Sequence, residues 1–202
     1  MIVVLFGPPA AGKGTQAKRI HAKYGVAHLS TGDMLRAAME EGTEIGKKAE
    51  PIVNSGKLVP DEIMVAIIAE RIAAPDCKKG FVLDGFPRTH GQAVALDSML
   101  NAKKLLVDHV IVMNVDQPQL IKRVESRVAE TLARGEPVRP DDSLEKFMGR
   151  LKVYNEQTLP TLPHYEGQGK VRRIDGMRSI EGVAAQIDAV LSDEKSGKSK
   201  AH

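Results

Sequence analysis

Residues 1–15, MIVVLFGPPAAGKGT, decide the fold, because an apolar run ends abruptly in a glycine-rich loop that contains a lysine. The run 1–6 has no polar residue, which is typical of a strand buried on both faces. Gly7, Gly12 and Lys13 then have the spacing G-x-x-x-x-G-K, and a helical pattern begins at Lys13. A strand, this loop and a helix, in that order, predict backbone N–H groups that surround phosphate oxygens. A glycine-rich turn that contains a lysine by coincidence is the weaker alternative.

Three polar side chains have expected roles around this loop. Lys13 supplies a positive charge for the β- and γ-phosphates of a nucleotide. Gly14 separates it from Thr15, whose hydroxyl is the natural neighbour of a nucleotide-bound magnesium ion. A second apolar run, 81–84, ends in Asp84, and such a carboxylate faces the metal from the neighbouring strand in P-loop enzymes. Asp84 could instead only cap the turn before Gly85, but its pairing with the loop favours the metal-side role.

Strand-like and helical segments alternate along the rest of the chain. Apolar runs lie at 1–6, 81–84, 108–115 and 170–174, and helical patterns at 13–24, 31–41, 61–74, 89–100, 117–128, 143–159 and 179–191. This alternation predicts an α/β fold with a parallel sheet covered by helices on both faces. Residues 30–59, which lack a strand pattern, and the polar segment 130–140 look like excursions from the sheet. The tail 192–202 has the composition of a disordered segment.

Length and composition exclude several classes of protein. The 202 residues fit one domain, here 1–191, and 42% hydrophobic with 27% charged residues is ordinary globular composition. No apolar run has the length of a membrane span, so no membrane partner is expected. The single cysteine, Cys77, excludes an internal disulfide and fits a reducing cytoplasm. The absence of Trp, 3% aromatic residues and a net charge of +3 argue against nucleic-acid binding.

Several arginines of the sequence suit a site for phosphoryl transfer between two nucleotides. Such a site must neutralise two polyanions, and rigid guanidinium groups do this well. Arg123 and Arg127 lie four residues apart and share a helix face. Arg139 and Arg150 flank the start of the next helix, with the polar segment 130–138 before them as a candidate cover. Each alone is more often a solvated surface residue. The whole set is Arg36, Arg88, Arg123, Arg127, Arg139 and Arg150.

Together these motifs resemble those of the adenylate kinase family. GPPAAGKGTQA at 7–17 is similar to its phosphate loop, LSTGDMLR at 29–36 to its monophosphate-site signature, and GKLVPDE at 56–62 to the segment that closes over AMP. FVLDGFPRTHGQA at 81–93 resembles its DGFPR signature. RVESR at 123–127, RPDD at 139–142 and RLKVYNE at 150–156 resemble its arginine-bearing lid and the following helix. The resemblance runs from Met1 to about Leu191.

The resemblance implies a P-loop three-layer fold with a central five-stranded parallel sheet, a helical monophosphate-binding insertion at 30–59 and a short lid at about 126–141. It implies direct in-line transfer from MgATP to AMP, giving two ADP without a covalent enzyme intermediate. The implied ATP-side residues are Ala10, Ala11, Gly12, Lys13, Gly14, Thr15, Arg123, Arg127 and Arg178. The implied AMP-side residues are Thr31, Arg36, Lys57, Leu58, Val59, Gly85, Phe86, Pro87, Arg88, Gln92, Arg139 and Arg150. The implied catalytic residues are Lys13, Arg88, Arg123, Arg139 and Arg150.

The chain departs from the family pattern at two places. Ala10 stands where the family usually has glycine, so the loop loses one conformationally permissive position. The lid is short and without cysteine, so no structural zinc is expected, and the expected metal is magnesium that arrives with ATP. The resemblance further implies a cytoplasmic monomer.

The acceptor base leaves alternatives open. A UMP/CMP kinase is the alternative within the family, although its chains usually carry alanine at the position of Thr31. The Thr31 hydroxyl and the Gln92 amide can hydrogen-bond an adenine edge. Thr31 could equally be an N-cap of the helix at 32–41, a role for which Ser30 competes. A non-catalytic nucleotide-binding module is the alternative outside the class, and the presence of Lys13, Asp84 and the arginines argues against it.

Overall fold

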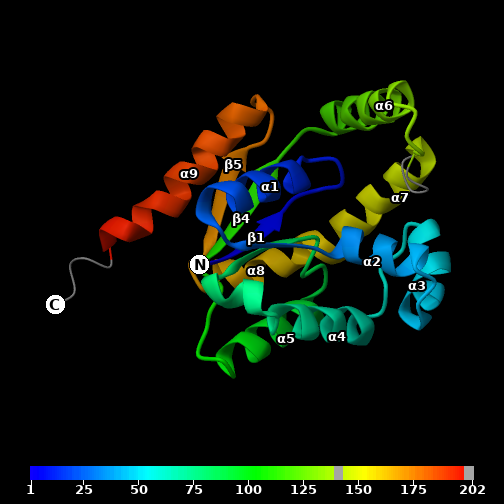
Figure 1. Ribbon diagram of the computed structural model, residues 1–202. Helices are drawn as coiled ribbons and strands as arrows, with labels where there is room; N and C mark the ends of the chain where they lie inside the picture. The colour runs from blue at the N-terminus through cyan, green and yellow to red at the C-terminus, as the bar shows by residue number, and fades with distance from the viewer. Residues whose placement is uncertain (139–142, 198–202) are drawn as a thin grey trace.

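The computed structural model describes residues 1–138 and 143–197, with the backbone alone for 193–197. In this part of the chain, five strands form one parallel sheet in the order β2-β3-β1-β4-β5 (Figure 1). The central strand is β1, in which Val4 pairs with Leu83 on one side and Val110 on the other. The strands are β1 (Ile2–Phe6), β2 (Ala27–Ser30), β3 (Phe81–Asp84), β4 (His109–Asn114) and β5 (Val171–Asp175). The predicted α/β fold with a five-stranded parallel sheet is confirmed.

Helices connect the strands. They are α1 (Lys13–Tyr24), α2 (Thr31–Glu40), α3 (Glu44–Asn54), α4 (Asp61–Ile72), α5 (His90–Asn101), α6 (Gln117–Ala133), α7 (Leu144–Val153), α8 (Leu162–Glu166) and α9 (Ile180–Gly197). A 3₁₀ segment at Pro75–Lys79 precedes β3. A π-helical segment at Tyr154–Thr158 and a 3₁₀ segment at Leu159–Thr161 lead from α7 into α8.

The apolar run in β1 is buried on both faces of the sheet. Val4 and Phe6 belong to a core cluster that includes side chains of α2, α3, α4, α5 and α8. Val3 and Leu5 belong to a second cluster with side chains of α1, α6, α7 and α9. Successive side chains of a strand point to opposite faces, so the two clusters are the two sides of the sheet. This explains why the strand has no polar residue.

Four segments differ from the sequence-based predictions. The strand β2 was not predicted, because its sequence AHLS buries only Ala27 and Leu29 and is too short to show a period. The predicted helix 143–159 ends as an α-helix at Val153. Helix α6 continues to Ala133, so part of the expected lid at 126–141 is helical. Helix α9 continues to Gly197, six residues beyond its predicted end at Leu191, because a nucleated helix adds residues readily when proline is absent.

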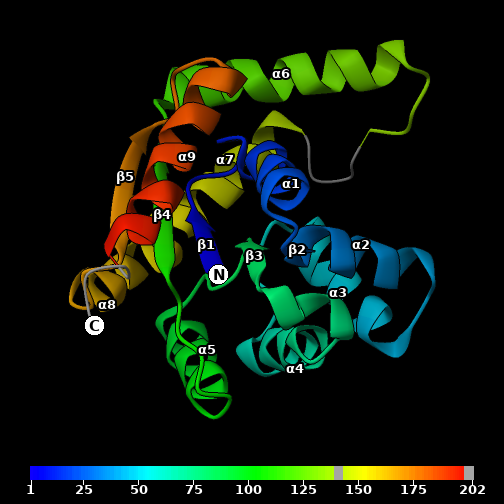
Figure 2. The same ribbon diagram turned by 60° about the vertical axis from the view of Figure 1, so that its left-hand side comes forward.

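The parallel sheet places the carboxyl ends of all the described strands along one edge. The segments that follow the strands there include Gly7 after β1, Thr31 after β2, Gly85 after β3 and Gly176 after β5. In Figure 1, β1 runs from the labelled N-terminus toward the side of the molecule where α6 and the α2–α3 pair lie. In Figure 2, α6 lies along the top and the α2–α3 pair at the lower right. Ligands of open α/β sheets bind outside the carboxyl ends of the strands, so this edge is where a site is expected.

Candidate functional site

A cavity of about 1510 Å³, counting its space open to solvent, lies along this edge of the sheet. Its walls contain the loop from Pro9 to Thr15 and the carboxylate-bearing Asp84 of β3. Arginines from distant parts of the chain also line it: Arg36, Arg88, Arg123, Arg127, Arg150 and Arg178. The structure therefore brings together every residue assigned to the ATP side from the sequence. Arg139 lies outside the described residues.

The loop between β1 and α1 contains left-handed backbone. Gly12, the N-cap of α1, has φ 96°, and Ala10 has φ 61°. A residue with a Cβ is strained in that region by about 1–2 kcal/mol, so Ala10 is strained where glycine would not be. The Nζ of Lys13 donates to the carbonyl oxygens of Gly7 at 2.7 Å and Pro8 at 2.8 Å. The lysine therefore lies against its own loop.

Lys13 lies in an environment that disfavours its charge. Burial lowers the pKa of its ammonium group to about 8, and the positive charges of Arg88 and Arg150 act in the same direction. Asp84 opposes this change in pKa. Because an anion would relieve the repulsion among these cations, the cluster is suited to binding a polyphosphate.

Asp84 is placed beside the phosphate loop with its charge retained. Burial acts to raise the pKa of Asp84, but the neighbouring His28 and the charges of Lys13 and Arg88 hold it below its ordinary value. A Cβ at Gly14 would lie 3.2 Å from Asp84 Oδ2, so the carboxylate lies directly against the loop. Thr15, an exposed residue, lies in the first turn of α1 next to Gly14. An ionised carboxylate and a hydroxyl fit a magnesium ion, which prefers oxygen ligands and keeps several waters.

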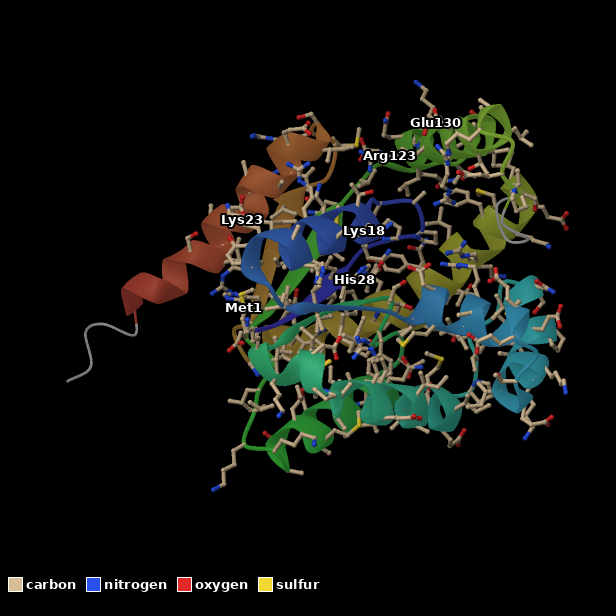
Figure 3. The ribbon with its side chains drawn as sticks, viewed as in Figure 1. Met1, Lys18, Lys23, His28, Arg123 and Glu130 are labelled. Atoms are coloured by element: carbon tan, nitrogen blue, oxygen red, sulfur yellow. The ribbon has the colours of Figure 1, made fainter. Side chains whose placement is uncertain are left out.

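Arg123 ties helix α6 to the loops of the site. Its Nη1 donates to the carbonyl oxygen of Ala11 at 3.0 Å, and its Nη2 donates to that of Gly176 at 2.7 Å. In the view of Figure 3, Arg123 lies on the α6 side of Lys18, and His28 lies on the other side. Arg178 is mostly exposed, with its Nε 3.4 Å from Asp175 Oδ2. Arg123 thus has a positioning contact that its spacing did not predict.

A second cavity, of about 620 Å³ with its open space, adjoins the first. It is lined by apolar side chains of Leu35, Val53 and Met64 and by most of the residues assigned to the AMP side. These are Thr31, Arg36, Lys57, Leu58, Val59, Gly85, Arg88, Gln92 and Arg150. Three of them, Arg36, Arg88 and Arg150, line both cavities.

Two residues assigned to the AMP side lie elsewhere. The side chain of Phe86 is 1% exposed and belongs to the core. Pro87 lines a smaller neighbouring cavity together with Lys13 and Arg150. The DGFPR stretch follows the buried strand β3, and its first large apolar residue packs into the same core cluster as Phe81 and Leu83.

The structure separates the roles of Ser30 and Thr31. Ser30 is the N-cap of α2, since its hydroxyl accepts from the backbone N–H of Asp33 at 3.3 Å. The alternative that Thr31 only caps this helix is therefore wrong. The Thr31 hydroxyl donates to the carbonyl oxygen of Gly85 at 2.9 Å and keeps its capacity to accept. A Cβ at Gly85, where φ is 85°, would lie 2.6 Å from that hydroxyl, so only glycine permits this approach.

Gln92 is 2% exposed, and both atoms of its side-chain amide are hydrogen-bonded. Its Nε2 donates to Asp61 Oδ1 at 2.8 Å, and its Oε1 accepts from the backbone N–H of Arg88 at 2.7 Å. Asp61 Oδ2 accepts from the Thr89 hydroxyl at 2.7 Å. The sequence analysis did not single out Asp61, because an acidic residue in the first turn of a helix is ordinary.

Some residues that line the larger cavity were not part of any motif identified in the sequence. They are Lys18, His28, Met113, Gly176, Ile180 and Val183. His28 belongs to the unpredicted strand β2, and its Nε2 lies 3.9 Å from Asp84 Oδ2. Within the described ranges, no three His, Cys, Asp or Glu side chains gather as a metal site. No helix in those ranges has the length and apolar character to cross a membrane.

Comparison with known proteins gives consistent matches. The family model described as adenylate kinase matches residues 5–170. The adenylate kinase of Sinorhizobium medicae (strain WSM419) is 51% identical over 192 residues, which are 95% of this chain and 100% of that protein. The adenylate kinase of Xanthobacter autotrophicus is 52% identical over 193 residues, 96% of this chain and 99% of that one. That of Azorhizobium caulinodans is 53% identical over 191 residues, 95% and 98% of the two chains.

Proposed function

Because the chain belongs to the adenylate kinase family, we propose that it transfers the terminal phosphoryl group of MgATP to AMP and forms two ADP. The observation that supports this most is the pair of adjoining cavities with Arg36, Arg88 and Arg150 in the walls of both. Guanidinium groups shared by two nucleotide-sized cavities suit a phosphoryl group that passes from one to the other.

The larger cavity is the proposed ATP site. The loop 7–15 would surround the phosphates with backbone N–H groups at the N-terminus of α1, and Lys13 would add a full charge. Lys13 would exchange its carbonyl partners in the loop for phosphate oxygens. Asp84 and Thr15 would hold the magnesium ion of MgATP, directly or through water. That ion would neutralise phosphate charge and orient the phosphate oxygens.

Transfer requires position and charge rather than a protein base. The attacking oxygen belongs to the phosphate of AMP, which is already ionised at neutral pH, so no histidine has to accept a proton. Lys13, Arg88 and Arg150 would stabilise the charge spread over the moving group. Arg123 would keep α6 against the phosphate loop while the ATP phosphates bind. Arg139, on the short lid, would approach the phosphates from the opposite side.

The smaller cavity is the proposed AMP site. The Thr31 hydroxyl has its proton in the hydrogen bond to Gly85, so it would accept a hydrogen bond from the exocyclic amine of adenine. Leu35 and Met64 provide apolar surface for the base. Alanine at this position, as in UMP/CMP kinases, would remove that acceptor. We further propose that the protein acts as a cytoplasmic monomer.

A substrate panel tests this function. The purified chain is supplied with MgATP and, separately, AMP, dAMP, CMP, UMP and GMP, and formation of diphosphate is followed. We expect kcat/KM to be highest for AMP. A higher value for CMP or UMP would assign the acceptor to pyrimidines, and no turnover with any acceptor would indicate a non-catalytic nucleotide-binding module.

A further inference from the structure

We propose that Asp61 is a positioning residue that sets base specificity by fixing the orientation of the Gln92 side-chain amide. This inference rests on the AMP site proposed above. It starts from a hydrogen-bonded chain of buried and half-buried groups on α4, α5 and the loop before α5. Asp61 Oδ1 accepts from Gln92 Nε2 at 2.8 Å, and Gln92 Oε1 accepts from Arg88 N at 2.7 Å.

The two partners of Gln92 leave its amide one orientation. An ionised carboxylate only accepts hydrogen bonds, and a backbone N–H only donates. Rotation of the amide by 180° would place Gln92 Nε2 against the N–H of Arg88, and Oε1 against the carboxylate of Asp61. Gln92 is 2% exposed, so water cannot replace the lost partners. Both mismatches would therefore fall on buried polar groups, which destabilises the rotated form.

Asp61 is itself held in place from the other side. Its Oδ2 accepts from the hydroxyl of Thr89 at 2.7 Å, and that hydroxyl accepts from the backbone N–H of Gln92 at 3.1 Å. A Cβ at position 91 would lie 2.8 Å from Asp61 Oδ2, so Gly91 leaves room for the carboxylate. The carboxylate thus joins the first turn of α4 to the first turn of α5.

A fixed amide discriminates between amino and oxo bases. After these two bonds, Gln92 keeps one N–H on Nε2 and acceptor capacity on Oε1. A 6-aminopurine presents an exocyclic amine donor beside a ring-nitrogen acceptor, and a 6-oxopurine presents an acceptor beside a donor. A freely rotating amide can pair with either pattern, whereas the amide fixed by Asp61 pairs with the amino pattern alone. Asp61 would therefore exclude IMP, GMP and UMP without contacting the base.

The test compares AMP with IMP, which differ at this edge of the purine ring. In Asp61→Asn, the new side chain can present either its oxygen or its amide nitrogen to Gln92, so the amide can rotate. We expect the ratio of kcat/KM for AMP to that for IMP to fall by about tenfold, with the change mainly in the KM values. The variant should still prefer AMP to IMP, because the Thr31 hydroxyl can still accept a hydrogen bond from the exocyclic amine of adenine.

The matched control is Asp97→Asn. Asp97 is also a half-buried aspartate of a hydrogen-bonded network, where Oδ2 lies 2.8 Å from His164 Nε2, and it lies in the later turns of α5. This substitution should lower the thermal stability by an amount similar to that of Asp61→Asn, but it should leave the AMP to IMP ratio of kcat/KM unchanged. A structural role for Asp61 alone would lower both kcat/KM values in proportion.

Several outcomes decide the proposal. A folded, active Asp61→Asn with the ratio of the unsubstituted chain would refute it, and so would an equal fall in the ratio for Asp97→Asn. If Asp61→Asn does not fold, Asp61→Ser provides the same test, because a hydroxyl can donate or accept. In the Gln92→Ala background, Asp61→Asn should change the ratio no further. Absence of AMP turnover by the unsubstituted chain would instead refute the proposed function.

Discussion

Replacing Lys13 by methionine should remove most of the activity and, at neutral pH, stabilise the fold. Burial lowers the pKa of the Lys13 ammonium from 10.5 to about 8, with Arg88 and Arg150 acting in the same direction and Asp84 opposing them. One pKa unit corresponds to about 1.4 kcal/mol, so the charged lysine destabilises the folded state by about 3 kcal/mol. Its hydrogen bonds to Gly7 and Pro8 are lost in the variant, so the net gain at pH 7 should be about 1–2 kcal/mol.

The pH dependence isolates the charge from these other contributions. Between pH 8 and 10.5 the folded chain binds fewer protons at Lys13 than the unfolded chain does. The contribution of Lys13 to the free energy of unfolding therefore rises with pH across this window and is lowest below it. Methionine has no such titration. The stability advantage of Lys13→Met should accordingly shrink by about 2 kcal/mol between pH 7 and pH 10.

The assay is urea unfolding of both proteins at pH 7, 8, 9 and 10, with Lys18→Met as the control for removing a positive charge from α1. Titrations elsewhere cancel in the difference between variant and unsubstituted chain. In parallel, kcat should fall by about three orders of magnitude, because transition-state charge loses its partner. A stability difference that stays constant from pH 7 to 10 would refute the pKa argument. Near-normal turnover in a folded variant would refute the catalytic assignment.

Three further substitutions test other parts of the site. Arg88→Ala should lower kcat by about two to three orders of magnitude in steady-state assays; a rise confined to KM for AMP would move Arg88 away from the transferred group. Thr31→Val should lower kcat/KM for AMP by about tenfold and leave that for UMP nearly unchanged, which the substrate panel measures. Ala10→Gly relieves left-handed strain but adds unfolded-state entropy, so urea unfolding should show a gain of no more than about 1 kcal/mol. A loss of stability there would contradict the strain argument.

The elements that could be predicted from sequence are those whose patterns are set by burial. The run 1–6 is buried on both faces and predicted β1 to within one residue, as Phe81–Asp84 predicted β3. The strand β2 lies at the edge of the sheet, where His28 and Ser30 are only partly buried, so its apolar pattern covers two positions. Helix ends were less predictable, because α6 and α9 continue through polar residues that favour a helix as well as a loop.

The positions of the site residues could be predicted better than their hydrogen bonds. The motifs identified Lys13, Arg88 and Gln92, and parallel strands bring such segments to one edge whatever the details of packing. A motif does not give the direction of a hydrogen bond. That Gln92 donates to Asp61, and that Thr31 donates to Gly85, depends on neighbours 31 and 54 residues away in the sequence.

The unfavourable features of this structure are concentrated where a polyanion is proposed to bind. Ala10 is held in left-handed backbone, and Lys13 is held where its charge is disfavoured by burial and by Arg88 and Arg150. Each would be partly relieved by phosphate oxygens that accept from the loop and neutralise the cations. The empty site therefore destabilises the folded chain. A bound polyanion recovers that free energy, because it neutralises the cations whose repulsion the fold leaves uncompensated. The same arginines line both cavities, so the second nucleotide adds to the neutralisation begun by the first.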